Sequence, residues 1–344
     1  MENFPVYWKT GLDDIDTAVK TLKRGKLVKQ TLSAGGRDIF FLMYGEKNDL
    51  KRTANLSSAL GAKNRNCYAD KTSPDYRPTL LLTGGVHGGE FEGIAALLNL
   101  ISIFETGVDL KGVRNDFLFN APDKYNILII PCANPDGRAR VSFIDTMVGR
   151  TFEELRYYNQ GTWKNGELCG YPECKGVHPI KEHCEVLGAY FNDDGVNMMH
   201  EDFFGKVSNE TRFLFDITDE YCPDLTVLLH GGTNIQTLIL KPAYVPDAVK
   251  EHILELEEAI KAQSDSEGLT YRVTPCDCGE NKPTPYSFNL ISALYHICGE
   301  PCVTYESNQG LTECDLPGFT HEEIYRAHMI LFEQSIKFID RSED

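Results

Sequence analysis

The sequence has no hydrophobic run long enough to span a membrane and no surplus of positive charge. A spanning helix needs about 18 consecutive apolar residues, and no apolar run in the chain approaches that length. Among 344 residues, 34 Lys and Arg stand against 51 Asp and Glu, for a net charge of -17. This balance argues against nucleic acid or an anionic membrane as a partner. The first residues also lack the basic and apolar regions of a signal peptide, so we expect a cytoplasmic protein.

A disulfide framework is a second feature that we do not expect. The chain has 11 cysteines, an odd number, and without a signal peptide they are expected to stay reduced. Most would act as small buried hydrophobic side chains. Two groups leave open a structural metal site or a redox pair, although their spacings match no familiar zinc motif. The first group is Cys169, Cys174, His178, His183 and Cys184, and the second is Cys276 and Cys278.

Apolar strands alternate with amphipathic helices along the chain, without internal repeats. Several strands are apolar throughout, which is typical of a sheet covered by helices on both faces. We predict the α/β class, with a mixed, mostly parallel, twisted sheet and helices on both faces, in a single domain over residues 1–344. The expected strands are 37–44, 79–83, 125–131, 225–229 and 301–305; the expected helices are 12–27, 91–105, 210–221, 249–261, 288–298 and 321–339; and 46–77 and 138–192 are expected to be irregular.

The most informative segment is the glycine-rich stretch 84–90, which reads GGVHGGE. It follows the apolar strand 79–83 and places His87 and Glu90 three residues apart. His230 also ends an apolar run and precedes two glycines. Ligands in such sheets come from the carboxyl ends of the strands. Two His and one Glu are a zinc ligand set that leaves a fourth position open for water. Either motif alone is common in proteins without metal, so the prediction depends on further segments.

Three such segments follow in a consistent order. The segment 134–137 reads NPDG, the segment 195–200 reads GVNMMH, and Glu306 directly follows an apolar run. This series resembles the zinc carboxypeptidase family, the carboxypeptidase A-like metallopeptidases, which is related to the desuccinylase and aspartoacylase group. Members of the family show an HxxE pair, NPDG, a GVDLNR-like segment, a strand-end histidine and a strand-end glutamate in this order. The resemblance extends over about residues 30–335.

The resemblance implies a metal centre and a general base. His87, Glu90 and His230 would hold one zinc ion per chain. Glu306 would take a proton from the attacking water and deliver it to the leaving amine. A carboxylate that ends an apolar strand is an unusual place for an ordinary surface glutamate, which favours the catalytic role.

Two further catalytic positions are implied less directly. The family has an arginine about a dozen residues after NPDG that supports the carbonyl oxygen, and Arg150 is the nearest match. Arg138 and Arg140 are its rivals, and we count Arg138 among the candidate substrate-binding residues. The family's mobile tyrosine lies some twenty residues before the glutamate, where this chain has Tyr286.

The segment 195–200 departs from the family pattern. Asn197 stands where the family has an aspartate that accepts a hydrogen bond from the first histidine ligand. Met199 and His200 stand in place of the Asn-Arg pair that grips the substrate's C-terminal carboxylate. Methionine cannot donate a hydrogen bond, and histidine is charged only if its pKa is raised. We keep Asn197 and His200 as candidate substrate-binding residues, but the resemblance does not extend to the grip on a free C-terminus.

The predicted function is a carboxypeptidase-like, zinc-dependent hydrolase of amide bonds, acting on a peptide or a small peptide-like or N-acyl substrate. One alternative is an N-acyl amino acid deacylase of the desuccinylase or aspartoacylase type, against which NPDG and the chain length argue. The other is a non-catalytic zinc-binding member of the same fold. A binding protein does not need Glu306 together with all three ligands, which argues against that alternative. The sequence gives neither the natural substrate nor the oligomeric state.

Overall fold

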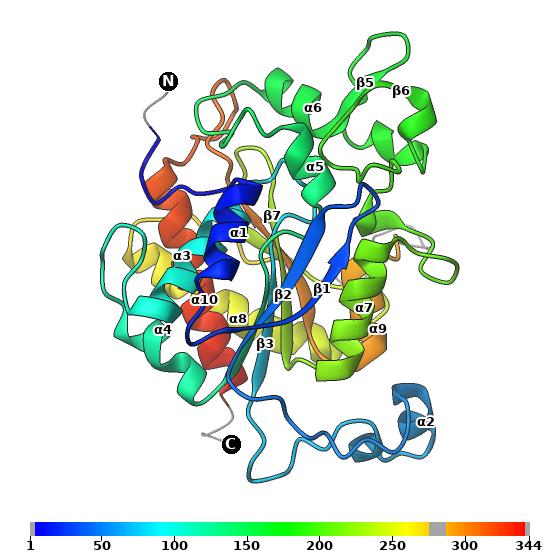
Figure 1. Cartoon of the computed structure of the whole chain (residues 1–344), viewed down its shortest axis with the longest axis vertical. Helices are drawn as coiled ribbons and strands as arrows, with labels where there is room; N and C mark the ends of the chain where they lie inside the picture. Colours follow the sequence, from blue (N-terminus) through cyan, green and yellow to red (C-terminus); the bar gives the residue numbers. More distant parts are fainter. Residues whose placement is uncertain (1–3, 275–286, 341–344) are drawn as a thin grey trace.

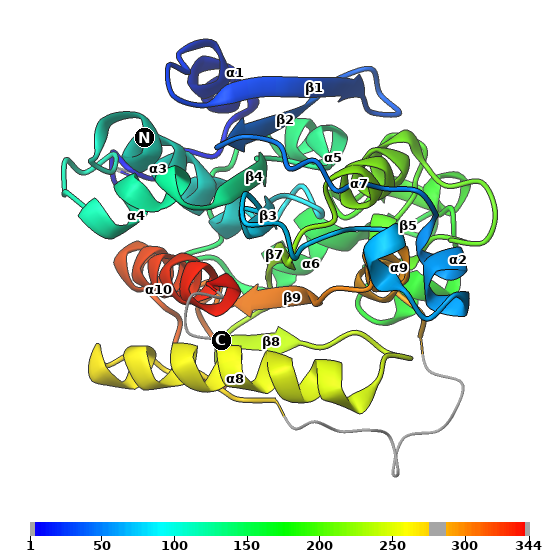
Figure 2. The same ribbon diagram turned by 90° about the horizontal axis from the view of Figure 1, so that it is seen from below.

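The computed structural model describes residues 4–274 and 287–340 and shows a mixed sheet between layers of helices (Figures 1 and 2). The strands of this seven-stranded sheet are β1 (Lys26–Leu32), β2 (Asp38–Tyr44), β3 (Thr79–Thr83), β4 (Asn126–Ile130), β7 (Leu225–Gly231), β8 (Leu238–Leu240) and β9 (Cys302–Ser307). Their order is β1-β2-β4-β3-β7-β9-β8. The four strands β4, β3, β7 and β9 are parallel, and the edge strands pair antiparallel. The predicted α/β class with a parallel central sheet is confirmed.

Helices cover both faces of the sheet, as predicted. They are α1 (Leu12–Lys20), α2 (Leu56–Gly61), α3 (Glu92–Thr106), α4 (Asp116–Asn120), α5 (Pro135–Arg140), α6 (Phe152–Gln160), α7 (Asn209–Tyr221), α8 (Asp247–Ser266), α9 (Leu290–Cys298) and α10 (His321–Ile339). Figure 1 shows α1, α3 and α10 on one side of the sheet and α7 and α9 on the other. None of the helices in the described part of the chain is long and apolar enough to cross a membrane.

The hydrophobic core has two layers, one on each face of the sheet. β3 is buried along its whole length. Leu80 and Leu82 belong to the cluster that includes α3 and α10, whereas Leu81 belongs to the cluster that includes α7 and α9. Successive side chains of a strand point to opposite faces, so an uninterrupted apolar run satisfies both layers. This two-sided burial fixes the strand ends from which the candidate ligands project.

The N-terminal helix is shorter than predicted. Apolar spacing suggested one helix over residues 12–27, but α1 ends at Lys20 and the chain continues as the edge strand β1. The turn between them passes close to the sheet, because a Cβ atom at Gly25 would lie 2.6 Å from the ring of Tyr44. Backbone pairing of β1 with β2 holds this segment. β-strand formation depends on the packing and pairing context more than on local propensity, so the apolar spacing of residues 12–27 does not reveal this hairpin.

Residues 138–192 are more ordered than predicted. They contain α6 and a two-stranded sheet of β5 (Gly161–Trp163) and β6 (Cys184–Leu187). α6 begins with a capping box, in which Thr151 accepts from the backbone of Glu154 and the Glu154 carboxylate accepts from the backbone of Thr151. The short 3-10 helices Glu173–Gly176 and Lys181–His183 complete the segment. The region predicted as irregular loops is therefore a small structured wall.

Candidate metal-binding and catalytic site

Two candidate ligands lie in the loop between β3 and α3, and the third lies at the end of β7. Because β3 and β7 are neighbouring parallel strands, the ends that carry His87, Glu90 and His230 meet at one edge of the sheet. The loop packs closely against the start of α5: a Cβ atom at Gly88 would lie 2.1 Å from the backbone nitrogen of Arg138. Only glycine permits this approach, which fixes the loop that carries the first two ligands.

The three side chains converge on one point. Nδ1 of His87 lies 2.8 Å from Oε1 of Glu90, and Nδ1 of His230 lies 2.8 Å from Oε2 of the same carboxylate. One ligand atom from each residue lies within 4.8 Å of the others, and all three residues are buried. Within residues 4–274 and 287–340, this is the group of His, Cys, Asp and Glu that could hold a metal ion. Two imidazole nitrogens and a carboxylate fit zinc, the ion that the resemblance implies.

The surroundings give Glu90 and His87 protonation states that suit a metal, whereas at His230 burial is outweighed by the charge of Glu90, which raises the pKa of that imidazole. Burial alone would raise the pKa of Glu90, but the two histidines outweigh burial and lower that pKa to about 2. Burial lowers the pKa of His87, which favours the neutral imidazole. Metal ligation requires a carboxylate and an imidazole with a free lone pair, and the surroundings favour both.

The contacts around His87 determine which of its nitrogens faces the candidate metal position. Nε2 of His87 lies 3.2 Å from Oδ1 of Asn197, and an amide oxygen can only accept, so Nε2 donates and Nδ1 keeps its lone pair. The ring of Tyr190 stacks on His87 with 3.8 Å between centroids and 14° between planes. Asn197 is held in turn by His178, whose Nε2 accepts from the Asn197 backbone at 3.0 Å. Asn197 thus orients the first ligand from the position that the family gives to aspartate.

Glu306 lies on the strand next to His230. β7 and β9 are parallel, with His230 opposite Glu306 in the register. Burial raises the pKa of Glu306 to about 7; the charge of His230 lowers it to a smaller extent, and the charge of Glu90 raises it further. A carboxyl group with a pKa raised towards neutrality, beside a possible metal site, is suited to exchange protons near pH 7.

These groups line a cavity of about 520 Å³. Its floor is formed by the candidate ligands and Glu306. Its walls come from the segment 152–200, the loop after β7, β8, and the residues Arg272, Ser287 and Asn289. The lining residues are His87, Glu90, Phe152, Leu155, Arg156, Gln160, Tyr171, Lys175, Tyr190, Asn197, Met199, His200, His230, Gly231, Gly232, Thr233, Ile235, Leu238, Leu240, Arg272, Ser287, Asn289, Thr304, Glu306 and Gln309.

His200 also lines this cavity, but with the properties of a neutral side chain. Burial lowers the pKa of His200 to about 3, and the positive charge of Lys175 adds to the effect. Its Nδ1 lies 3.4 Å from Oγ of Ser287. A neutral imidazole is a weak anchor for a carboxylate, in contrast to the arginine that the family has at this position.

The other predicted residues lie away from the cavity or outside the described chain. Arg138 is buried in the scaffold, where its guanidinium donates to the backbone oxygens of Thr10, Val141 and Ile144. Arg150 donates to Glu154 and to the backbone oxygen of Thr146, and it does not line the cavity. Tyr286 lies outside the described residues.

Arg156, Lys175 and Arg272 also line the cavity. The sequence left open that an arginine of the segment 138–156, which includes Arg156, replaces the Asn-Arg pair, but it did not indicate Lys175 or Arg272. For Arg156 a signal was available. The Thr151–Glu154 capping box marks the start of a helix, and Phe152, Leu155 and Arg156 then fall on one helical face. Lys175 and Arg272 lie outside regular α-helices and strands, and no periodic pattern points to them.

The first cysteine group packs as a hydrophobic cluster. Cys169, Cys174 and Cys184 lie together with aromatic and aliphatic side chains beneath the cavity wall. Burial raises the pKa of Cys169 to about 12 and that of Cys174 to about 11, which favours the thiols over the thiolates that bind metals. Cys276 and Cys278 lie outside the described residues.

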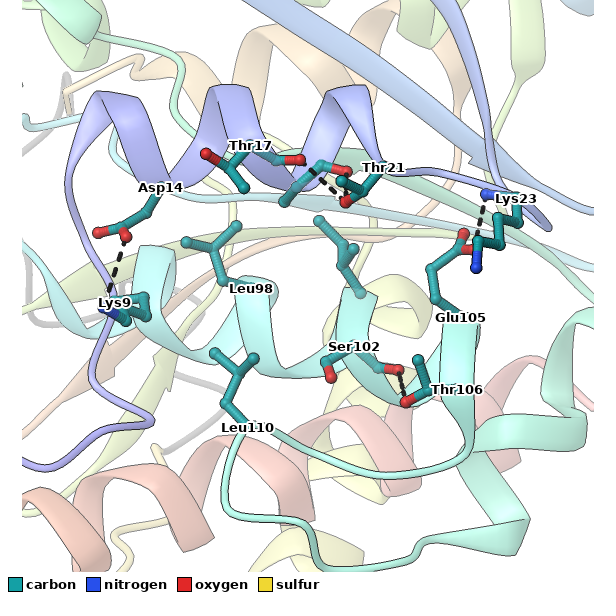
Figure 3. Close-up of a pocket in the computed structure, with 12 residues that line it drawn as sticks. Lys9, Asp14, Thr17, Thr21, Lys23, Leu98, Ser102, Glu105, Thr106 and Leu110 are labelled. Carbon is teal, nitrogen blue, oxygen red and sulfur yellow. Dashed lines mark hydrogen bonds and ion pairs between the residues drawn. The ribbon is translucent and has the colours of Figure 1, made fainter.

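A second hollow, of about 470 Å³, lies between α1 and α3, on the face of the sheet that α1, α3 and α10 cover (Figure 3). Its apolar wall includes Leu98, Ile101 and Leu110, and Lys9 and Asp14 form an ion pair at its rim. No histidine or cysteine lines it. It therefore carries none of the chemistry found in the cavity at the strand ends.

Comparison with known proteins agrees with this geometry. The sequence model of the zinc carboxypeptidase family matches residues 20–280. No curated protein sequence matches the chain.

Several solved structures share the fold at low sequence identity. A metallo-carboxypeptidase from Burkholderia cenocepacia is 14% identical with a TM-score of 0.57, over 94% of this chain and 67% of that one. One from Pseudomonas aeruginosa, in complex with (2-guanidinoethylmercapto)succinic acid, is 13% identical with a TM-score of 0.57, over 95% of this chain and 68% of that one. The carboxypeptidase A from Helicoverpa armigera is 15% identical with a TM-score of 0.52, over 97% of this chain and 73% of that one. The chain thus spans about two thirds of the length of the bacterial structures.

Proposed function

The chain belongs to the zinc carboxypeptidase family, and on that premise we propose that it is a zinc-dependent hydrolase of amide bonds with one zinc ion per chain, held by His87, Glu90 and His230. The observation that carries the proposal is the convergence of these three side chains beside Glu306 on the floor of one cavity. A metal held by three protein ligands keeps a position open for water or substrate.

In this proposal zinc, when bound, supplies a Lewis acid that polarises a carbonyl group and acidifies water. Glu306 takes the proton from the attacking water and delivers it to the leaving amine. The raised pKa of Glu306 supports both halves of this role, because burial brings its proton affinity close to neutral pH. Asn197 keeps His87 oriented by accepting its Nε2 hydrogen bond.

The proposed substrate is a peptide or a small peptide-like or N-acyl compound. A cavity of about 520 Å³ is in the range that accommodates a ligand of a few residues. Its walls combine apolar side chains such as Leu155 and Ile235 with polar ones such as Gln160 and Asn289. The neutral His200 and the apolar Met199 supply no charge for a C-terminal carboxylate, so this anchor has to come from elsewhere in the cavity.

A substrate panel on purified protein tests the proposal. The panel contains peptides with a free C-terminus, their amides, and N-acyl amino acids, each assayed with zinc-loaded and zinc-depleted protein. We expect hydrolysis of at least one class, loss of activity on zinc depletion, and recovery when zinc is added back. Stoichiometric zinc without hydrolysis of any class would instead favour a non-catalytic member of the family.

A further inference from the structure

The cavity at the strand ends is unusually basic for so acidic a protein. The chain carries a net charge of -17. Among the residues that the structure describes, the cavity lining nevertheless contains three cations, Arg156, Lys175 and Arg272, against two carboxylates, Glu90 and Glu306. In the proposed function a zinc ion would neutralise Glu90 further. Walls of low dielectric focus such a field, so the cavity attracts anions that the rest of the surface repels.

Arg156 projects from α6 into this cavity without a carboxylate partner. No ion pair within 4.0 Å joins its guanidinium to an Asp or Glu of the described chain. The Glu173 carboxylate lies nearby, because Oε2 of Glu173 would be 3.2 Å from the same Cβ position at Gly170 that Nη2 of Arg156 approaches, and the guanidinium lies 5.8 Å from the centre of the Phe152 ring. The guanidinium lies where a side chain at Gly170 would be, because a Cβ atom there would be 2.1 Å from Nη2. Gly170 has φ of +66°, a conformation that favours glycine. The local backbone therefore leaves room for the arginine head at the cavity wall.

Lys175 reaches the same cavity from the short 3-10 helix Glu173–Gly176. Its Nζ donates to the hydroxyl of Tyr171 at 2.8 Å and lies 4.3 Å from the centre of that ring. The helix is held in place by Cys174, which is buried in the cluster beneath the wall. The charge of Lys175 reaches the catalytic floor, since it contributes to lowering the pKa of both Glu306 and His200.

We propose that Arg156 and Lys175 form the anion subsite that holds a carboxylate of the substrate, in place of the Asn-Arg pair that Met199 and His200 have replaced. The inference rests on the proposed function and adds its substrate class: peptides or N-acyl amino acids that carry a free carboxylate. Both cations come from the segment 152–176, and they line the same cavity as the candidate ligands and Glu306. A guanidinium and an ammonium group can together satisfy a carboxylate, whereas a lone neutral histidine cannot.

The test measures binding rather than turnover. The dissociation constants of N-benzoylglycyl-phenylalanine and of its C-terminal amide are measured by calorimetry on the zinc-loaded Glu306→Gln protein. We expect the free acid to bind at least about tenfold more tightly than the amide, because a charge-assisted hydrogen bond is lost with the carboxylate. Arg156→Gln and Lys175→Met should each reduce this preference, and the double variant should abolish it.

Matched controls keep the result specific. Arg212→Gln removes an arginine that also contacts an aromatic ring but does not line the cavity, and Lys164→Met removes a lysine of the same segment outside the cavity. Both should keep the full preference. Equal binding of acid and amide by the parent, a preference that survives in the double variant, or a preference lost in Arg272→Gln alone would each overturn the proposed subsite.

The binding test also separates this inference from the proposed function. If the protein prefers the free acid but hydrolyses no substrate in the panel, the result supports the anion subsite and contradicts the proposed activity. If the protein hydrolyses amides through zinc and Glu306 but binds acid and amide equally, the result supports the proposed activity and contradicts the anion subsite.

Discussion

The metal-binding floor and the wall 152–176 of the same cavity are built in different ways. The floor consists of side chains at the ends of buried parallel strands, whose positions follow from the sheet itself. The wall consists of the short helix α6, the short strand β5 and the 3-10 helix Glu173–Gly176, all of which lie outside the main sheet. The floor carries the features that the family shares, whereas the wall carries the cations that would replace its missing Asn-Arg pair. In the proposed function, chemistry and recognition therefore reside in separate parts of the fold, and we expect that each can be altered without the other.

The largest effect should come from removing a ligand on the floor. We expect His230→Ala to lose most of its zinc and nearly all hydrolytic activity, because two protein ligands hold the ion far less well than three. Metal analysis after purification without chelator measures the loss. The control is His252→Ala, which removes an exposed histidine of α8. Full zinc content in His230→Ala would contradict the assignment of the floor.

Glu306→Gln should separate binding from catalysis on the same floor. The substitution is nearly isosteric, so we expect zinc content and folding to remain while the rate falls by about 10²–10⁴-fold, the usual contribution of a general acid–base group. The measurement is kcat with a substrate from the panel. Turnover at the parent rate would mean that another residue is the base.

Replacing Arg138 tests whether this buried residue stabilises the fold rather than binds the substrate. Its guanidinium satisfies several buried backbone oxygens, so Arg138→Leu should lower the free energy of unfolding by at least about 2 kcal/mol. Denaturant unfolding measures this change, with Arg212→Leu as control. KM of the folded variant should stay at the parent value. A raised KM with unchanged stability would show that Arg138 binds the substrate, as the sequence suggested.

Asn197 should have a smaller effect on the metal. Removing the acceptor for Nε2 of His87 leaves the ring free to rotate, and such supporting contacts typically contribute about 10–100-fold to metal affinity. We expect Asn197→Ala to weaken zinc binding within that range and Asn197→Asp to strengthen it. Competition with a chelator of known affinity measures both variants. Unchanged affinity in Asn197→Ala would show that this contact does not orient the ligand.

The pH profile should show the smallest but most specific effect. Glu306 works as a base only when deprotonated, so kcat/KM falls as the pH drops below its pKa. Burial raises that pKa to about 7, and a bound cation would lower it again. The acid limb should therefore lie below about 7 but above about 4.3, the ordinary value for glutamate. A profile that stays flat down to about pH 4 would contradict the buried base.

The sequence was sufficient to predict the floor but not the wall. His87, Glu90, His230 and Glu306 follow uninterrupted apolar runs, and parallel strands bring such ends together, so pattern alone indicated their proximity. Arg138 and Arg150 were chosen by their distance along the chain from NPDG. In the structure neither lines the cavity: Arg138 donates to buried backbone oxygens, and Arg150 donates to Glu154 and to the backbone oxygen of Thr146. Lys175 enters the cavity through contacts of its short helix with a separate cluster, which sequence periodicity does not encode.

The central claim is that zinc is held by two imidazoles and one carboxylate at the strand ends. X-ray absorption at the zinc edge of the metal-loaded protein tests it most directly. The account predicts a first shell of nitrogen and oxygen at about 2.0–2.2 Å and no sulfur. A sulfur shell at about 2.3 Å would place the metal on cysteines and contradict the account.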